Sequence, residues 1–324
     1  MERVLEFLGR RRVLVGLQLA LVVVVLVVFA YVLRTSWHDA VPLLKTADLT
    51  DIGIALTVLA AYYLLFVLGW QWILRGLGIN IRYPLALQSE MASMLAKYVP
   101  GAFWTPLARV LWLRRAGIHR NDVVIGSIGL EAGISAVSGV LVFAFGLLTV
   151  DASPIILVPL GLFAVLVGVC IHPRIYTRLT GRIFRRFGAS EIPMLRYRTM
   201  LGLLAFYSCT WLVGGVALLF LCRSLGDDPG WSTVPYLGGA AAVGAIVSVL
   251  TIVAPSGLGV REASMYGLLL PVTTEGVALG VTVLNRLAIT LVEAVLLGVG
   301  LLVWKFARPP TQDPSWPEPA LDRE

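Results

Sequence analysis

Long apolar segments, separated by short polar ones, dominate the chain. A helix needs about 20 mostly apolar residues to cross the hydrocarbon core of a bilayer. Six segments meet that requirement: 13–33, 52–74, 123–148, 154–171, 199–222 and about 277–304. Two further apolar regions, about 85–115 and 236–271, are long enough for two passes, but Pro and Gly residues interrupt each of them. The pattern predicts an all-α polytopic membrane protein with about six full transmembrane helices and two re-entrant broken-helix hairpins.

The composition supports a single transmembrane domain. Hydrophobic residues make up 58% of the chain and charged residues 14%, and the mean hydropathy is +0.86. A soluble surface needs more charge than this, so we expect one transmembrane domain over residues 1–308 and no soluble domain. The segment 309–324 contains five prolines and is predicted to be a disordered cytoplasmic tail. Tryptophans are expected at the membrane interfaces, namely Trp70, Trp72, Trp104 and Trp112.

The arginines predict how the chain is oriented. Short cytoplasmic loops collect Lys and Arg, and arginines cluster before residue 13, at 75–82, at 114–120 and at 174–198. By contrast, 271–276 has no Lys or Arg. Both termini are therefore predicted to be cytoplasmic, with one hairpin entering from each side of the membrane. This order predicts an inverted repeat, with repeat 1 at about 50–148 and repeat 2 at about 199–304.

The breaks in the two hairpins are candidate ligand sites. They fall at Pro100-Gly101 and at Pro255 to Gly259, which includes Gly257. Irregular backbone inside a membrane normally lines a cavity, and helix amino termini favour anions such as phosphate. These residues are therefore predicted to bind a substrate anion. The alternative is a tight turn whose Arg261 extends to the membrane interface.

Ionisable residues inside the membrane are costly and usually mark a pathway or a site. The three arginines among them are predicted to bind substrate: Arg109, Arg261 and Arg286. The remaining ionisable residues have two possible roles, coupling to a proton or ion and structural ion pairing. They are Glu90, Lys97, Glu131, Glu262 and Glu293.

Two spacings refine this prediction. Neighbouring helix positions point about 100° apart, so one of Arg261 and Glu262 should face a cavity while the other pairs with a neighbouring helix. Glu131 lies 31 residues after Pro100 and Arg286 lies 31 after Pro255. Opposite charges are therefore expected at equivalent places in the two repeats. Ser127, Ser135 and Ser138 share one helical face with Glu131 and predict a polar stripe.

The residues predict no catalytic arrangement. No His or Cys residues have metal-ligand spacing, and no glycine-rich nucleotide loop follows a strand. We therefore expect no cofactor and no metal, and a transporter rather than an enzyme. The net charge of +7 is expected to reflect membrane orientation rather than nucleic-acid binding. The alternative function is a non-catalytic accessory subunit of a lipid-linked glycosyltransferase in cell-envelope biosynthesis.

Several stretches resemble the lysylphosphatidylglycerol synthase transmembrane-region family: "KYVPGAFWTPLARVLWLRRAGI", Glu131, "APSGLGVREASMYGLL" and "LNRL". The resemblance covers roughly residues 10–305. It implies a flippase-like domain in the bacterial cytoplasmic membrane that moves an anionic lipid, without the aminoacyltransferase domain of two-domain members. The substrates implied are modified phosphatidylglycerol, polyprenyl-phosphate-linked sugars and glycolipids, with an envelope glycosyltransferase as a candidate partner. The bulky Phe103-Trp104 departs from the small residues expected there and predicts that the two repeats are not used equally.

Overall fold

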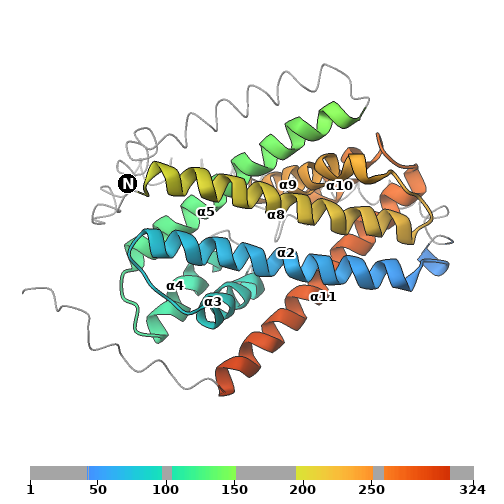
Figure 1. The fold of residues 1–324 in the computed structure, drawn as a ribbon. Coiled ribbons are helices and arrows are strands. Elements are labelled where there is room, and N and C mark those ends of the chain that lie inside the picture. The colour runs from blue at the N-terminus through green and yellow to red at the C-terminus, as the bar shows by residue number, and fades with distance from the viewer. Residues whose placement is uncertain (1–41, 43, 97–103, 151–194, 251–258, 307–324) are drawn as a thin grey trace, which may run out of the picture.

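The computed structural model describes residues 42, 44–96, 104–150, 195–250 and 259–306 (Figure 1). These residues form helices, with no strand among them. The α-helices are α2 (Leu49–Gly76), α3 (Tyr83–Ala96), α4 (Trp104–Arg115), α5 (Asn121–Gly146), α8 (Tyr197–Ser224), α9 (Val234–Leu250), α10 (Val260–Leu269) and α11 (Glu275–Phe306). Two short 3-10 helices are η1 (Leu147–Thr149) and η2 (Trp231–Thr233). The predicted all-α class is confirmed.

Four helices are long and apolar enough to cross a membrane. They are α2, α5 extended by η1, α8 and α11 up to Gly300, and they match the spans predicted at 52–74, 123–148, 199–222 and 277–304. The 28 residues of α2 extend about 42 Å at 1.5 Å per residue. Several predicted features lie outside the described residues: the spans 13–33 and 154–171, the tail 309–324, and Lys97, Pro100, Gly101, Pro255 and Gly257.

Large apolar side chains cover the outside of these helices. Phe145 of α5, Leu148 of η1 and Leu287 of α11 are at least 60% exposed. Water would disfavour so much exposed apolar surface, whereas the hydrocarbon of a bilayer accepts it. The chain is accordingly a multi-pass membrane protein.

The two broken regions each form a pair of short helices. The α3–α4 pair begins and ends at the end of the bundle where α2 finishes, and the α9–α10 pair begins and ends at the opposite end (Figure 1). Tyr236 at the start of α9 donates a hydrogen bond to the carbonyl of Leu268 at the end of α10, over 2.7 Å. Both pairs are therefore hairpins that return to the end from which they start.

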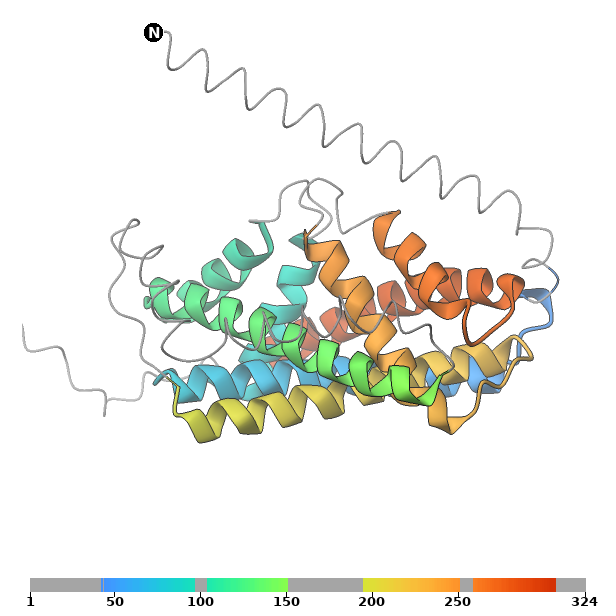
Figure 2. The same ribbon diagram turned by 90° about the horizontal axis from the view of Figure 1, so that it is seen from above.

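Helices α2 and α8 lie side by side and antiparallel (Figure 1), and together they form one side of the molecule (Figure 2). The amide of Asp48, which caps α2, donates to the carbonyl of Ser224 at the end of α8 over 2.8 Å. Tyr207 of α8 packs against Gly69 and Phe66 of α2 and is completely buried. For Trp70 the predicted place at the membrane interface is wrong: its ring lies in the protein core, whereas Trp72 is 40% exposed.

The helix contacts follow one rule. The described α-helices fall into two groups of four, a first group of α2, α3, α4 and α5 and a second group of α8, α9, α10 and α11. If each helix is replaced by the helix at the same position in the other group, every pair of helices in extensive contact maps onto another pair in contact, or onto itself. Thus α5 packs on α9 as α11 packs on α3, and α4 packs on α5 as α10 packs on α11. The α3–α4 hairpin therefore packs against α2 and α5 of its own group and against α11 of the second group. The α9–α10 hairpin packs in the same way against α8, α11 and α5.

Glycines bring α9 unusually close to its neighbours. A Cβ at Gly146 of α5 would collide with the backbone of Tyr236, and a Cβ at Gly215 of α8 would collide with the carbonyl of Val234. On the corresponding contact of the other hairpin, the Gln88 side chain of α3 bridges to the Gly300 carbonyl of α11 over 3.0 Å. Backbone-to-backbone packing thus fixes α9, and with it the position of α10.

The ends of the bundle differ in charge. One end carries the arginines near the ends of α2 and α4 and in the adjoining turns: Arg75, Arg82, Arg114, Arg115 and Arg120. The other end carries Asp48, Asp51, Asp227, Asp228 and Glu275. There Arg223 donates to Asp228 over 3.0 Å, and this hydrogen bond lowers the pKa of the Asp228 carboxyl below its usual value.

Candidate functional site

Arg109 of α4 lies between two carboxylates. Its Nη2 is 2.8 Å from Glu90 Oε1 on α3, and its Nη1 is 2.5 Å from Glu131 Oε2 on α5. All three side chains are at most 7% exposed. We call these three residues the closed cluster.

Polar and aromatic groups complete the surroundings of the closed cluster. The guanidinium of Arg109 stacks over Trp70, 4.7 Å from the ring centroid, and its Nε donates to Ser93 Oγ over 3.3 Å. Trp70 in turn donates from Nε1 to Ser127 Oγ over 3.0 Å. The four residues of the predicted stripe on α5 are all buried, so the expected polar face exists and turns inward.

The two carboxylates of the closed cluster are supported unequally. Both oxygens of Glu131 have a donor, because Tyr207 donates to Oε1 over 3.4 Å in addition to the Arg109 contact. Glu90 accepts from Arg109 on Oε1, while its Oε2 is buried without a hydrogen-bond partner. Both glutamates contact Arg109, and coupling to a proton or ion stays a prediction for them.

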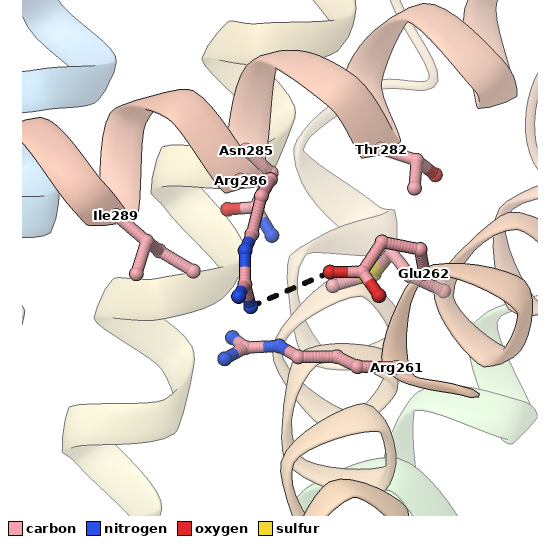
Figure 3. Close-up of a pocket in the computed structure, with 7 residues that line it drawn as sticks. Arg261, Glu262, Thr282, Asn285, Arg286 and Ile289 are labelled. Atoms are coloured by element: carbon pink, nitrogen blue, oxygen red, sulfur yellow. Dashed lines mark ion pairs between the residues drawn. The ribbon is translucent and has the colours of Figure 1, made fainter. Parts of the chain in front are cut away.

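A second ionic site lies between α10 and α11, and it is open. It is a small pocket lined by Arg261, Glu262, Met265, Thr282, Asn285, Arg286 and Ile289 (Figure 3). Two arginines and a single carboxylate line it, so its formal charge is positive. We call it the α10–α11 pocket.

One carboxylate organises this pocket. Glu262 Oε2 accepts the backbone N–H of Gly259 over 2.7 Å, which caps the start of α10 where Gly259 has a φ of +83°. Its Oε1 lies 3.4 Å from Arg286 Nη1 (Figure 3). The Gly259 N–H, predicted to meet a substrate anion, is therefore engaged by Glu262 in this structure.

Arg261 extends toward the same space as Arg286 (Figure 3). Within the described residues, no hydrogen bond or ion pair reaches its guanidinium. Gly244 of α9 lies beneath its stem, where a Cβ would be 3.9 Å from Arg261 Cγ. Glu262 thus pairs with the neighbouring helix through Arg286, and both Glu262 and Arg261 line the pocket.

The remaining polar lining comes from α11. Thr282 donates its hydroxyl to the carbonyl of Ala278 over 2.8 Å, which leaves its lone pairs as acceptors. The Asn285 side chain is 8% exposed and makes no hydrogen bond to the described part of the chain. An amide and two guanidinium groups facing one pocket are donors suited to an oxyanion.

The structure separates the predicted site residues into two groups. Arg261 and Arg286 share the α10–α11 pocket, whereas Arg109 lies in the closed cluster and does not line it. Glu293, two turns beyond Arg286 on α11, accepts a hydrogen bond from the hydroxyl of Tyr63 over 2.7 Å. Among the described residues, no group of three or more His, Cys, Asp or Glu side chains is arranged to hold a metal.

Sequence reasoning missed several members of the two sites. They are Trp70, Ser93 and Tyr207 around the closed cluster, and Thr282 and Asn285 in the pocket. Thr282 lies one turn before Arg286 on the same face of α11, so a search for polar residues at helical spacing could have found it. Tyr207 carries no such local signal, because it meets Glu131 only through the packing of α8 on α5.

Comparison with known proteins identifies the family. Among curated proteins none matches the chain significantly. The family model described as the lysylphosphatidylglycerol synthase TM region matches residues 14–298. This match extends from the first predicted span almost to the end of α11 and includes both ionic sites. The chain therefore belongs to the lysylphosphatidylglycerol synthase transmembrane-region family.

Proposed function

We propose that this protein is a lipid transporter that moves an anionic or phosphate-bearing lipid across the bacterial cytoplasmic membrane, and that the α10–α11 pocket binds the headgroup. One observation carries the proposal: Arg261 and Arg286 face one pocket that contains a single carboxylate, Glu262. A positive charge in a partly dehydrated pocket attracts an anion strongly. Guanidinium groups also match the geometry of phosphate oxygens.

Binding would proceed by exchange of partners. The Arg286–Glu262 contact is 3.4 Å long and Arg286 is 20% exposed, so a phosphate group can reach the guanidinium. When it does, Glu262 retains its bond from the Gly259 N–H and the start of α10 stays capped. Arg261 supplies the second charge, and Asn285 supplies an amide donor. The headgroup thus replaces a carboxylate that the protein itself provides.

The surroundings of the pocket suit a substrate with lipid tails. Leu287 and Leu291 follow the pocket residue Arg286 along α11 and are 61% and 52% exposed. Their side chains point away from the protein, although α11 also carries the polar residues that line the pocket. The headgroup can therefore enter the pocket while its acyl or prenyl chains remain in the hydrocarbon.

We further propose that the two helix groups form an inverted repeat, with both termini in the cytoplasm. The exchange rule of the helix contacts supports a two-fold relation. The arginine-rich end agrees with a cytoplasmic location, so the α3–α4 hairpin would enter from the cytoplasm and the α9–α10 hairpin from outside. With a headgroup site on one hairpin and a buried ion cluster on the other, the substrate would pass between them.

Reconstitution into vesicles tests the transport function. Purified protein is placed in vesicles containing labelled phosphatidylglycerol, labelled polyprenyl phosphate or labelled phosphatidylcholine, and the fraction of label reaching the other leaflet is followed over time. We expect transport of at least one of the two anionic lipids over phosphatidylcholine. In Arg261→Ala the rate should fall about 10- to 100-fold, because a hydrogen bond to a charged group contributes about 1.5–3 kcal/mol.

The matched control is Arg82→Ala, which removes an exposed arginine remote from the pocket and should retain the wild-type rate. Full transport by Arg261→Ala, or equal losses in the two variants, would refute the role of the pocket. Absence of transport for every anionic lipid would refute the transporter itself.

A further inference from the structure

The closed cluster carries one more carboxylate than it has cations. Glu90 and Glu131 flank Arg109, and the formal charge of the three groups with both glutamates ionised is −1. All three are nearly inaccessible. An uncompensated charge in such surroundings is strongly unfavourable, and a buried carboxyl group normally takes up a proton instead.

The hydrogen bonds indicate which carboxyl holds the proton. Glu131 receives a donor on each oxygen, from Arg109 and from Tyr207, and these donors stabilise its ionised form. Among the described residues, Glu90 receives a donor on Oε1, from Arg109, and none donates to its buried Oε2. The ionised form of Glu90 is therefore the less supported of the two.

We propose that Glu90 carries an exchangeable proton on Oε2 in the resting protein, beside an intact Arg109–Glu131 ion pair. The cluster is then neutral, with one cation, one anion and one uncharged acid. This inference concerns the resting protein and does not rest on transport. It assigns to the α3–α4 hairpin a proton-binding site in the membrane interior, on the opposite hairpin from the α10–α11 pocket.

The structure also locates other ionisable groups near α3 within its described residues. Tyr83 on α3 donates its hydroxyl to the Leu64 carbonyl over 2.9 Å, and Tyr62 of α2 lies within electrostatic reach of Glu90. On α11, which packs along α3, Glu293 is bonded by Tyr63. Among the described residues, Arg109 is thus the one cation in contact with Glu90, and Glu131 already engages it.

Infrared spectroscopy of the protein in lipid nanodiscs tests the inference. A protonated carboxyl group gives a carbonyl stretch above the amide bands. We expect the wild type at neutral pH to show this band, to shift it in deuterated water, and to lose it in Glu90→Gln. The Glu293→Gln variant, which changes another buried glutamate, should keep it.

Two further variants locate the proton. In Tyr207→Phe the band should stay at the wild-type position, because Tyr207 contacts Glu131 and not Glu90. In Glu90→Asp it should persist at a shifted position, which keeps the experiment informative if Glu90→Gln does not fold. Identical spectra for wild type and Glu90→Gln would overturn the proposal, and a band displaced in Tyr207→Phe would place the proton on Glu131 instead.

Discussion

Arg109 and Arg286 each connect a hairpin to a long helix, but their surroundings differ. Arg109 links α4 to α5 through Glu131, so the positive charge of this pair lies on the hairpin. Arg286 links α11 to α10 through Glu262, so here the positive charge lies on the long helix. In the part of the chain that the structure describes, Arg109 contacts two carboxylates and is 6% exposed, whereas Arg286 lies 3.4 Å from the Glu262 carboxylate and is 20% exposed.

This difference underlies the proposal that the closed cluster has a structural role and the α10–α11 pocket a binding role. A buried pair with short contacts leaves no room for a ligand, and losing one partner strands a charge. A longer, partly exposed pair contributes little to stability and can exchange its partner. Under this proposal, the same combination of residues holds one hairpin in place and leaves the other available for an anion.

The largest expected effect is on the closed cluster. Replacing Arg109 by Met leaves the Glu131 carboxylate buried without a cation, which should lower the free energy of unfolding by about 3–5 kcal/mol. Denaturant unfolding in detergent micelles measures it. The comparison variant, Arg261→Met, should lose less than about 1 kcal/mol, since no ion pair to Arg261 is found in the described part of the chain. Equal losses in the two variants would contradict the division of roles.

A smaller effect is expected from Glu262→Gln in the open pocket. This change removes the carboxylate that competes for Arg286 while keeping an oxygen for the Gly259 N–H. Binding of phosphatidylglycerol should become about fivefold tighter, which corresponds to the loss of about 1 kcal/mol of competing ion pairing. Titration with lipid in mixed micelles measures the affinity, and unchanged or weaker binding would argue against exchange of partners at Arg286.

The smallest effect is expected from salt. The screening length falls from about 10 Å at 0.1 M to about 3 Å at 1 M, so high salt should weaken anion binding at the open pocket several-fold. The closed cluster is shielded by protein and should not respond. Melting temperatures, compared between wild type and Arg109→Met across the same salt range, should therefore differ by a constant amount. A gap that closes with salt would mean that water and ions reach the closed cluster.

The helices were largely predictable, because membrane spans depend on local composition. Four predicted spans agree with α2, α5, α8 and α11 to within a few residues, and the Pro and Gly breaks predicted two hairpins of shorter helices. The pairing of one of Arg261 and Glu262 with a neighbouring helix was also predictable, because it follows from the angle between adjacent positions of a helix.

The partners across helices were not predictable. Arg109 was grouped with the two other arginines because all three are cations inside the membrane, yet it meets Glu90 and Glu131 only through the packing of α3, α4 and α5. Trp70 was placed at the membrane interface because tryptophans are common there, but its ring covers Arg109 in the core. Burial depends on which helices meet, and hydrophobic periodicity along one helix does not determine that.

Native mass spectrometry of bound lipid tests the central claim most directly. The protein is released from micelles containing equal amounts of phosphatidylglycerol and phosphatidylcholine, and the bound lipids are counted for the wild type, for Arg82→Ala and for the double variant Arg261→Ala/Arg286→Gln. We expect the wild type and Arg82→Ala to retain phosphatidylglycerol preferentially, and the double variant to lose that preference. An undiminished preference for phosphatidylglycerol in the double variant would show that the headgroup binds elsewhere and would contradict the assignment of the α10–α11 pocket.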